Sequence, residues 1–288
     1  MAVVNPRHDD NDLALTGIPR GGTTLACRLL GQATGCVALF EPIDPARIPP
    51  TPAAAIEFIA GFFRQARTSL LENGTAPSKQ HDGQVPDNPF PDPAPGARKL
   101  LATLGMLRPE PPPQPGFTLA IKHNASFAAL LPGLSNRIRT IAIVRNPLAV
   151  LASWNSVPLP VRDGRLPAGE RLDPGLRAKL AEERETDLRQ LAILHWFFDR
   201  FETSLPPGQV VRYEDIIASG GKVLHACAGL EGAPDPHLRE RDAGSAYQGV
   251  DVGGQARRLL DAPGSWRRWY GDDEVAALAR RMAENGIQ

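Results

Sequence analysis

The chain has 288 residues, of which 42% are apolar and 22% charged, a composition typical of globular proteins that bury a sizeable core. Its formal net charge is zero, with 32 basic and 32 acidic residues, which disfavours a globally basic surface for nucleic acid, heparin or anionic membranes. Three cysteines without metal-ligand spacing, a start without an apolar leader and no apolar run of bilayer length predict a cytoplasmic protein without a membrane span.

The first part of the chain predicts strands alternating with helices. A buried strand over Asp12–Ile18 leads into a glycine-rich turn and then into a helix over Thr23–Leu30. A second short strand over Val37–Phe40 ends at Glu41, and the next helix is predicted over Ala53–Leu71. This order of elements is typical of a parallel sheet covered by helices.

The stretch from about residue 73 to 116 interrupts this order. Eleven of the 29 prolines lie between Pro77 and Pro115, and the stretch has no hydrophobic period. It is too long for an ordinary connection. We therefore expect either a disordered insert or a lid over a binding site.

Regular structure resumes with a predicted strand over Phe117–Lys122 and a helical turn over Ser126–Leu131. The most strand-like run of the chain is Arg139–Val144, and a helix is predicted to follow it over Pro147–Trp154. These two units repeat the alternation of the first part.

The last third of the chain is predicted to be mainly helical. Its segment of about 158–204, which we expect on the substrate side, contains a long amphipathic stretch over Pro174–Phe201. A strand over Gln209–Tyr213, a helix over Asp215–Leu230 and a terminal helix over Asp272–Met282 complete the pattern.

The whole pattern predicts one domain over residues 1–288, with three-layer α/β/α architecture and a central, mostly parallel sheet. Ligands of such folds bind outside the carboxyl ends of the strands. Five polar residues fall at predicted strand ends: Arg20, Glu41, His123, Arg145 and Glu214.

The segment GIPRGGTT at residues 17–24 has the form of a phosphate-binding loop between a strand and a helix. A nucleoside-triphosphatase P-loop carries a lysine before its final Ser or Thr, but Thr23 stands there in this chain. The cation of the loop is Arg20, whose planar fork suits bidentate contact with an anion. A plain strand-to-helix turn is the alternative interpretation.

A second anion-binding element follows the strand in mid-chain. Arg145 comes directly after the strand, and Ser153 lies about two turns into the predicted helix, where its hydroxyl can share an anion with the arginine. Taken singly, these residues also fit a surface turn and an ordinary helix serine. Together with the glycine-rich loop they favour anion binding over these alternatives.

These two elements together resemble the 3′-phosphoadenosine-5′-phosphosulfate (PAPS)-dependent sulfotransferases, in a bacterial-type form. The 5′-phosphosulfate loop of that family reads P-[K/R]-S-G-T-T, and its 3′-phosphate motif reads R-x-P-x-x-x-x-x-S. FEP at residues 40–42, VRYEDI at 211–216 and GSWRRWY at 264–270 are also similar and follow the family's order. One departure is Gly21, which stands where most members have serine.

The resemblance implies a P-loop sulfotransferase fold with PAPS as the bound donor and no required metal. The residues that it assigns to the 5′-phosphosulfate are Arg20, Gly21, Gly22, Thr23 and Thr24, and those that it assigns to the 3′-phosphate are Arg145 and Ser153, with Arg257, Arg258 or Arg267 as further candidates. Many cytosolic members stack adenine on a Trp where this chain has Leu25, so Tyr213 or Trp266 is the candidate instead.

The acceptor hydroxyl needs a general base, and two residues compete for this role. Glu41 lies where carbohydrate and tyrosyl-protein sulfotransferases place a carboxylate, and we prefer it. His123 lies at a place that resembles the KTH of cytosolic enzymes. With ordinary pKa values, a carboxylate base would keep the rate at mildly acidic pH, whereas a histidine base would lose it below about 6.5.

Other polar residues have weaker assignments. Lys122 is one of only five lysines, and we expect it to contact charge that develops on the transferred group; a solvent-facing lysine is the alternative. Arg20 would act on the same charge. Glu214 and Asp215 are expected to hold structure.

The resulting expectation is sulfuryl transfer from PAPS to a hydroxyl of a small-molecule acceptor, in line and with a general base. The alternatives are a P-loop kinase of a small metabolite and a non-catalytic nucleotide-binding protein. A small acceptor is preferred to a polyanionic glycan because no basic groove is evident. The identity of the acceptor and the oligomeric state stay open at this point.

Overall fold

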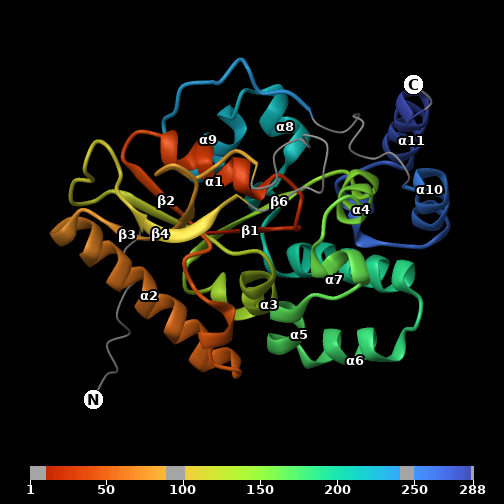
Figure 1. Ribbon diagram of the computed structural model, residues 1–288, viewed down its shortest axis with the longest axis horizontal. Coiled ribbons are helices and arrows are strands. Elements are labelled where there is room, and N and C mark those ends of the chain that lie inside the picture. Colours follow the sequence, from red (N-terminus) through yellow and green to blue (C-terminus); the bar gives the residue numbers. More distant parts are fainter. Residues whose placement is uncertain (1–10, 89–100, 241–249, 287–288) are drawn as a thin grey trace.

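The computed structural model describes residues 11–88, 101–240 and 250–286. A sheet of five parallel strands lies at its centre, in the order β2-β5-β1-β6-β7 (Figure 1). The strands are β1 (Asp12–Gly17), β2 (Cys36–Phe40), β5 (Thr118–Lys122), β6 (Arg139–Val144) and β7 (Val210–Arg212).

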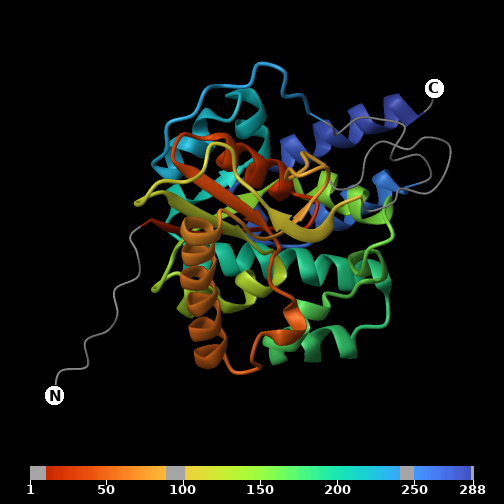
Figure 2. The same ribbon diagram turned by 60° about the vertical axis from the view of Figure 1, so that its left-hand side comes forward.

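The sheet is covered by helices on both faces, which confirms the predicted three-layer architecture. The helices α1, α8 and α9 lie on one side and α2, α3 and α7 on the other (Figure 1 and Figure 2). Along β1, Leu13 and Leu15 pack toward α1, whereas Ala14 packs toward α2 and α3. Because both faces are covered, all six residues of β1 are buried.

The helices that flank the sheet are short to medium in length. Those of the first two thirds are α1 (Thr23–Gln32), α2 (Pro52–Asn73), α3 (Ala125–Leu134), α4 (Pro147–Asn155), α5 (Pro167–Leu172), α6 (Pro174–Glu182) and α7 (Thr186–Ser204). Those of the last third are α8 (Tyr213–Ala218), α9 (Lys222–Ala228), α10 (Val252–Asp261) and α11 (Asp272–Gly286). None of the described helices is both long and apolar enough to cross a bilayer.

The proline-rich stretch contains a strand pair that the sequence pattern did not predict. Strands β3 (Ala76–Gln80) and β4 (Thr103–Leu107) pair antiparallel beyond the β2 edge of the sheet. The hydroxyl of Ser78 fixes them there, because it accepts a hydrogen bond of 2.9 Å from the backbone N–H of Phe40. A disordered insert therefore does not hold for these two strands of the stretch over residues 73–116, and residues 89–100 lie outside the described residues.

Helix boundaries also differ from the predicted ones. The long amphipathic stretch forms two helices, α6 and α7, and the single helix predicted over Asp215–Leu230 forms α8 and α9. The second break follows from Gly220 and Gly221, which have positive φ values of 61° and 91°. Helix α10 was not predicted, because Gly253 and Gly254 weaken the helical pattern at its start.

Glu214 joins three distant parts of the chain. At the start of α8, one carboxylate oxygen accepts a hydrogen bond of 2.8 Å from the backbone N–H of Asn146, just before α4. The other oxygen accepts one of 2.7 Å from the hydroxyl of Tyr270, near the start of α11. These contacts hold structure, and Tyr270 is 1% exposed.

We expect Tyr270→Phe to lower the free energy of unfolding by about 1–3 kcal/mol, because it removes a donor from a partly buried carboxylate without changing the shape of the core. Denaturant unfolding followed by circular dichroism measures this. The matched control is Arg268→Gln, which changes an exposed ion pair two residues away and should stay within about 0.5 kcal/mol of wild type. Equal stability of wild type and Tyr270→Phe would contradict the assigned role.

Candidate functional site

The parallel strands β1, β2, β5 and β6 bring their carboxyl ends to one edge of the sheet. The ladder continues one residue past two strand ends: the N–H of Glu41 donates to the carbonyl of Lys122 at 2.9 Å, and that of His123 donates to Leu15 at 3.0 Å. This edge is where the sequence places its candidate residues.

The loop after β1 turns sharply. Arg20 has a φ of 68°, a left-handed conformation that is uncommon for a residue with a side chain. Gly21 donates its N–H to the carbonyl oxygen of Ile18 at 2.8 Å, and a Cβ at position 21 would lie 2.8 Å from the same oxygen. This crowding explains why glycine stands here instead of serine.

Gly22 lies against the ring of Tyr213, and a Cβ at this position would come within 2.3 Å of that ring. Gly22 is also the N-cap of α1, and no described side chain caps this helix start. Thr23 and Thr24 follow in the buried first turn. The first N–H groups of α1 are therefore without a side-chain cap from the described residues, which suits the binding of an anion.

An arginine cluster, formed by Arg20, Arg145, Ser153 and Tyr213, joins this loop to α4. The guanidinium of Arg145 donates to the backbone carbonyl of Arg20 at 2.9 Å and lies over the ring of Tyr213, 4.6 Å from its centre. The side chain of Arg20 donates to the hydroxyl of Ser153 at 3.1 Å. The structure thus brings together four of the residues that the resemblance assigns to the donor.

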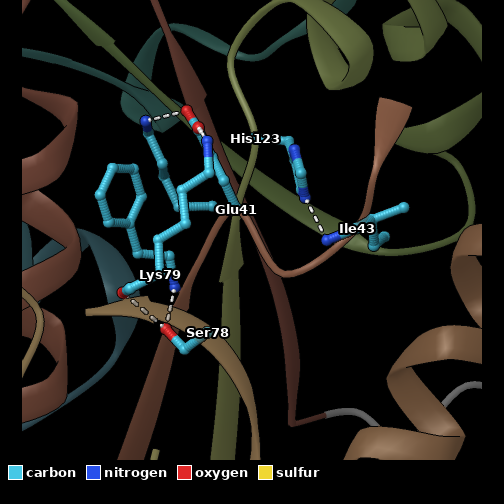
Figure 3. A network of polar contacts seen from close by, with 7 residues as sticks. Glu41, Ile43, Ser78, Lys79 and His123 are labelled. Atoms are coloured by element: carbon cyan, nitrogen blue, oxygen red, sulfur yellow. Dashed lines mark hydrogen bonds and ion pairs between the residues drawn. The ribbon is translucent and has the colours of Figure 1, made fainter. Parts of the chain in front are cut away.

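A second group, the lysine–glutamate cluster, is formed by Glu41, Lys79 and Lys122 (Figure 3). Lys122 donates to one carboxylate oxygen of Glu41 and Lys79 to the other, each at 2.6 Å. Burial acts to raise the pKa of Glu41, but the charges of the two lysines outweigh it and hold that pKa well below its usual range. The carboxylate is therefore ionised and strongly paired.

The two lysines differ in exposure. The Lys122 side chain is 3% exposed and its ammonium lies over the Phe40 ring, 4.5 Å from the centre, so the alternative of a solvent-facing lysine does not hold. The Lys79 side chain is 34% exposed. Sequence reasoning missed Lys79 because it lies in the proline-rich stretch, although its rarity in an arginine-rich chain was a usable signal.

His123 lies beside this cluster, but it is 3% exposed and already bonded. Its Nε2 accepts a hydrogen bond of 3.1 Å from the N–H of Ile43 (Figure 3). Its ring packs 5.1 Å from that of Phe127. Burial, aided by the nearby lysine charges, lowers the pKa of His123 from 6.5 to about 3. The ring is neutral over the whole mildly acidic range, so loss of rate below pH 6.5 no longer distinguishes His123 from Glu41.

The other residues that the resemblance assigns to the 3′-phosphate or to adenine either lie apart from these two clusters or are held by contacts with other parts of the protein. Arg258 pairs with Asp187 of α7, and Arg257 is exposed on α10. Trp266 is fully buried beneath the guanidinium of Arg267. Tyr213 is 4% exposed with Arg145 over its ring, so its contacts position that arginine rather than present an open ring to adenine.

Strand β3 contacts the lysine–glutamate cluster through Lys79, and the segment after it contacts the arginine cluster. Asn88 accepts a hydrogen bond of 3.3 Å from the Arg20 guanidinium, and Asp87 lies 3.9 Å from that of Arg28 on α1. The expectation of a lid over a binding site stays a prediction, and residues 89–100 lie outside the described part.

Two cysteines and the groups able to bind a metal ion were the remaining candidates for reactive chemistry among the described residues. Cys27 and Cys36 are buried thiols, and burial raises the pKa of each to about 12, so neither is a nucleophile at neutral pH. No three His, Cys, Asp or Glu side chains among the described residues gather in a way that would hold a metal ion.

Comparison with known proteins shows a likeness at the level of structure only. No protein-family model and no curated protein matches the chain. Among solved structures, it is similar to a crystal structure of a sulfotransferase from Alicyclobacillus acidocaldarius, with 14% sequence identity, a TM-score of 0.39 and coverage of 96% of this chain and 95% of that one. At this TM-score the likeness does not establish a shared fold, so function has to be inferred from the two clusters.

Proposed function

We propose that this protein is a sulfotransferase that moves a sulfuryl group from PAPS to a hydroxyl of a small molecule. One observation carries the proposal: the arginine cluster and the lysine–glutamate cluster lie on one sheet edge, and each contains a residue with a strained backbone. Among described non-glycine residues, only Arg20, Glu41 and Asp82 have positive φ values. Backbone strain of this kind concentrates at functional sites.

The arginine cluster fits a donor with anionic groups at two positions. Arg20 and the first turn of α1 would bind the 5′-phosphosulfate through the guanidinium and the backbone N–H groups of the helix start. Arg145 and Ser153 would bind the 3′-phosphate. Without the P-loop lysine, which Thr23 replaces, the loop is less suited to the β- and γ-phosphates of a nucleoside triphosphate. This favours PAPS over the kinase alternative.

Glu41 would accept the proton of the acceptor hydroxyl as its oxygen attacks sulfur. A new oxygen–sulfur bond forms, the bond between sulfur and the 5′-phosphate oxygen breaks, and 3′,5′-adenosine bisphosphate leaves. Lys122 and Arg20 would stabilise the charge that develops on the transferred group and the leaving oxygen. Glu41 is a weak base while both lysines pair with it. Movement of one lysine away from Glu41 and toward this charge would therefore raise the basicity of the carboxylate.

His123 would act as a positioning residue. Its Nε2 lone pair holds the N–H of Ile43, two residues after Glu41, so the ring fixes the turn that carries the carboxylate. A proton acceptor whose lone pair is already used is a poorer general base than Glu41. We therefore assign the base to Glu41.

A non-catalytic nucleotide-binding protein is the second candidate. The observation that favours it is the double ion pair, which keeps Glu41 from acting as a base in this state. Both candidate functions predict that the donor binds, but only the sulfotransferase transfers the sulfuryl group to an acceptor.

We expect 3′,5′-adenosine bisphosphate to raise the melting temperature, and Arg145→Ala to weaken its binding about 10- to 100-fold, because one charge-assisted contact is lost. Calorimetric titration measures the dissociation constants, and circular dichroism checks folding of the variant. The matched control is Arg258→Ala on α10, whose arginine pairs with Asp187 and should leave affinity unchanged. No thermal shift at millimolar ligand, or an equal loss in both variants, would count against the proposal.

We expect Glu41→Gln to lower transfer at least 100-fold with bisphosphate affinity unchanged, because the variant lacks the proton acceptor. His123→Gln should stay within tenfold of wild type, since its amide oxygen can accept the Ile43 N–H. Labelled PAPS with a panel of hydroxylated acceptors, read by mass spectrometry, measures both. Full activity of Glu41→Gln would overturn the assignment, and bisphosphate binding without transfer to any acceptor would favour the second candidate.

The pH dependence has a definite sign. The two lysines depress the pKa of Glu41, so the base stays ionised well below pH 4.5 and the rate should persist in mild acid. Lys79→Met removes one of these charges, so the pKa of Glu41 rises and the acidic limb of the rate profile moves to higher pH. Lys79→Arg should keep the wild-type limb. An unshifted limb in Lys79→Met would show that Glu41 does not control it.

A further inference from the structure

The hairpin of β3 and β4 has one buried face and one exposed apolar face. Side chains alternate along both strands, so Ala76, Ser78 and Leu107 point inward, where each is buried. Leu104 and Met106 point outward and are 61% and 55% exposed, the two highest values among the large apolar side chains that the structure describes.

The exposed face is continuous with the lysine–glutamate cluster. Lys79 is the cross-strand partner of Leu104, and directly opposed residues of an antiparallel pair project from the same face. The next outward pair along the hairpin is Pro77 with Met106. The Lys79 side chain starts on this face, and its ammonium lies 2.6 Å from a Glu41 oxygen.

The polar and apolar parts of this surface are therefore joined by one side chain. A hydroxyl placed at Glu41 has the methylene stem of Lys79 beside it, and beyond the stem lie Leu104 and Met106. These two side chains form a small exposed apolar patch next to the polar cluster.

We propose, as a deepening of the sulfotransferase function and resting on it, that the acceptor is an amphiphile whose apolar body binds to the face formed by Pro77, Lys79, Leu104 and Met106. The acceptor class is thus an aliphatic or aromatic alcohol with its hydroxyl at one end, and not a sugar or another molecule that is polar throughout. A second copy of the chain fits this face less well, because two apolar side chains fall far short of the roughly 800 Å² that each partner buries in a stable dimer.

The first test uses straight-chain primary alcohols, from butanol to decanol, as acceptors with labelled PAPS. In wild type, kcat/KM should rise about two- to fourfold for each added methylene, up to the length of the apolar face. The double variant Leu104→Ser/Met106→Ser should flatten this dependence and raise KM for decanol about tenfold, with bisphosphate affinity unchanged. The matched control is Leu71→Ser, which removes a 43% exposed leucine on α2 and should leave the dependence as in wild type.

The acceptor assignment is overturned if kcat/KM of wild type does not depend on chain length, or if this dependence persists in the double variant. Transfer to polar acceptors with normal bisphosphate binding then leaves the sulfotransferase function intact. Light scattering tests whether a second copy of the chain occupies this face. If the double variant changes the oligomeric state but not the chain-length dependence, the face is an interface between copies.

A second measurement does not depend on turnover. Saturation-transfer NMR of octanol, in the presence of 3′,5′-adenosine bisphosphate, should show contact with wild type and with Leu71→Ser but not with the double variant. Absence of octanol binding to wild type overturns the acceptor assignment, and absence of bisphosphate binding in the same sample overturns the sulfotransferase function.

Discussion

The carboxylate of Glu41 is shared by two lysine ammonium groups, and this bridge ties the central sheet to the hairpin beside it. Lys122 comes from β5, next to β2 in the sheet, whereas Lys79 comes from β3 in the proline-rich stretch. The bridge sets the ionisation of Glu41, and through Lys79 it fixes where the apolar face of the hairpin lies relative to the sheet edge. The acceptor side of the proposed site depends on it.

The zero net charge of the chain conceals a strongly local arrangement of charge. Two arginines and two lysines lie along one sheet edge, and the lysine–glutamate cluster itself carries a net positive charge. Elsewhere, several described arginines pair with carboxylates, as Arg258 does with Asp187 and Arg267 with Asp272. An anionic ligand can therefore be drawn to one edge of a molecule that is neutral as a whole.

Local patterns were enough to predict the main sheet and most of the candidate residues. A strand that ends in a glycine-rich turn predicts an anion site at that turn, and this reasoning located Arg20. Spacing along a helix put Ser153 on the face near Arg145. Such inferences work because a parallel sheet gathers its strand ends at one edge, whatever the remaining topology.

Contacts that depend on tertiary packing could not be predicted from the sequence. Lys79 meets Glu41 across 38 residues of sequence, and Pro77 and Gly105 hide the strand signal of the hairpin that carries it. The neutral state of His123 depends on its burial and on the backbone N–H of Ile43, neither of which is visible in a residue pattern. Sequence reasoning finds titratable residues, but their surroundings decide which of them can act as a base.

A crystal structure of this protein with bound 3′,5′-adenosine bisphosphate tests the central claim most directly. The account predicts the 3′-phosphate within hydrogen-bond distance of Arg145 and Ser153, and the 5′-phosphate on Arg20 and the first turn of α1. Binding of either phosphate by Arg257 and Arg258 on α10, or anywhere away from the loop after β1, would contradict it.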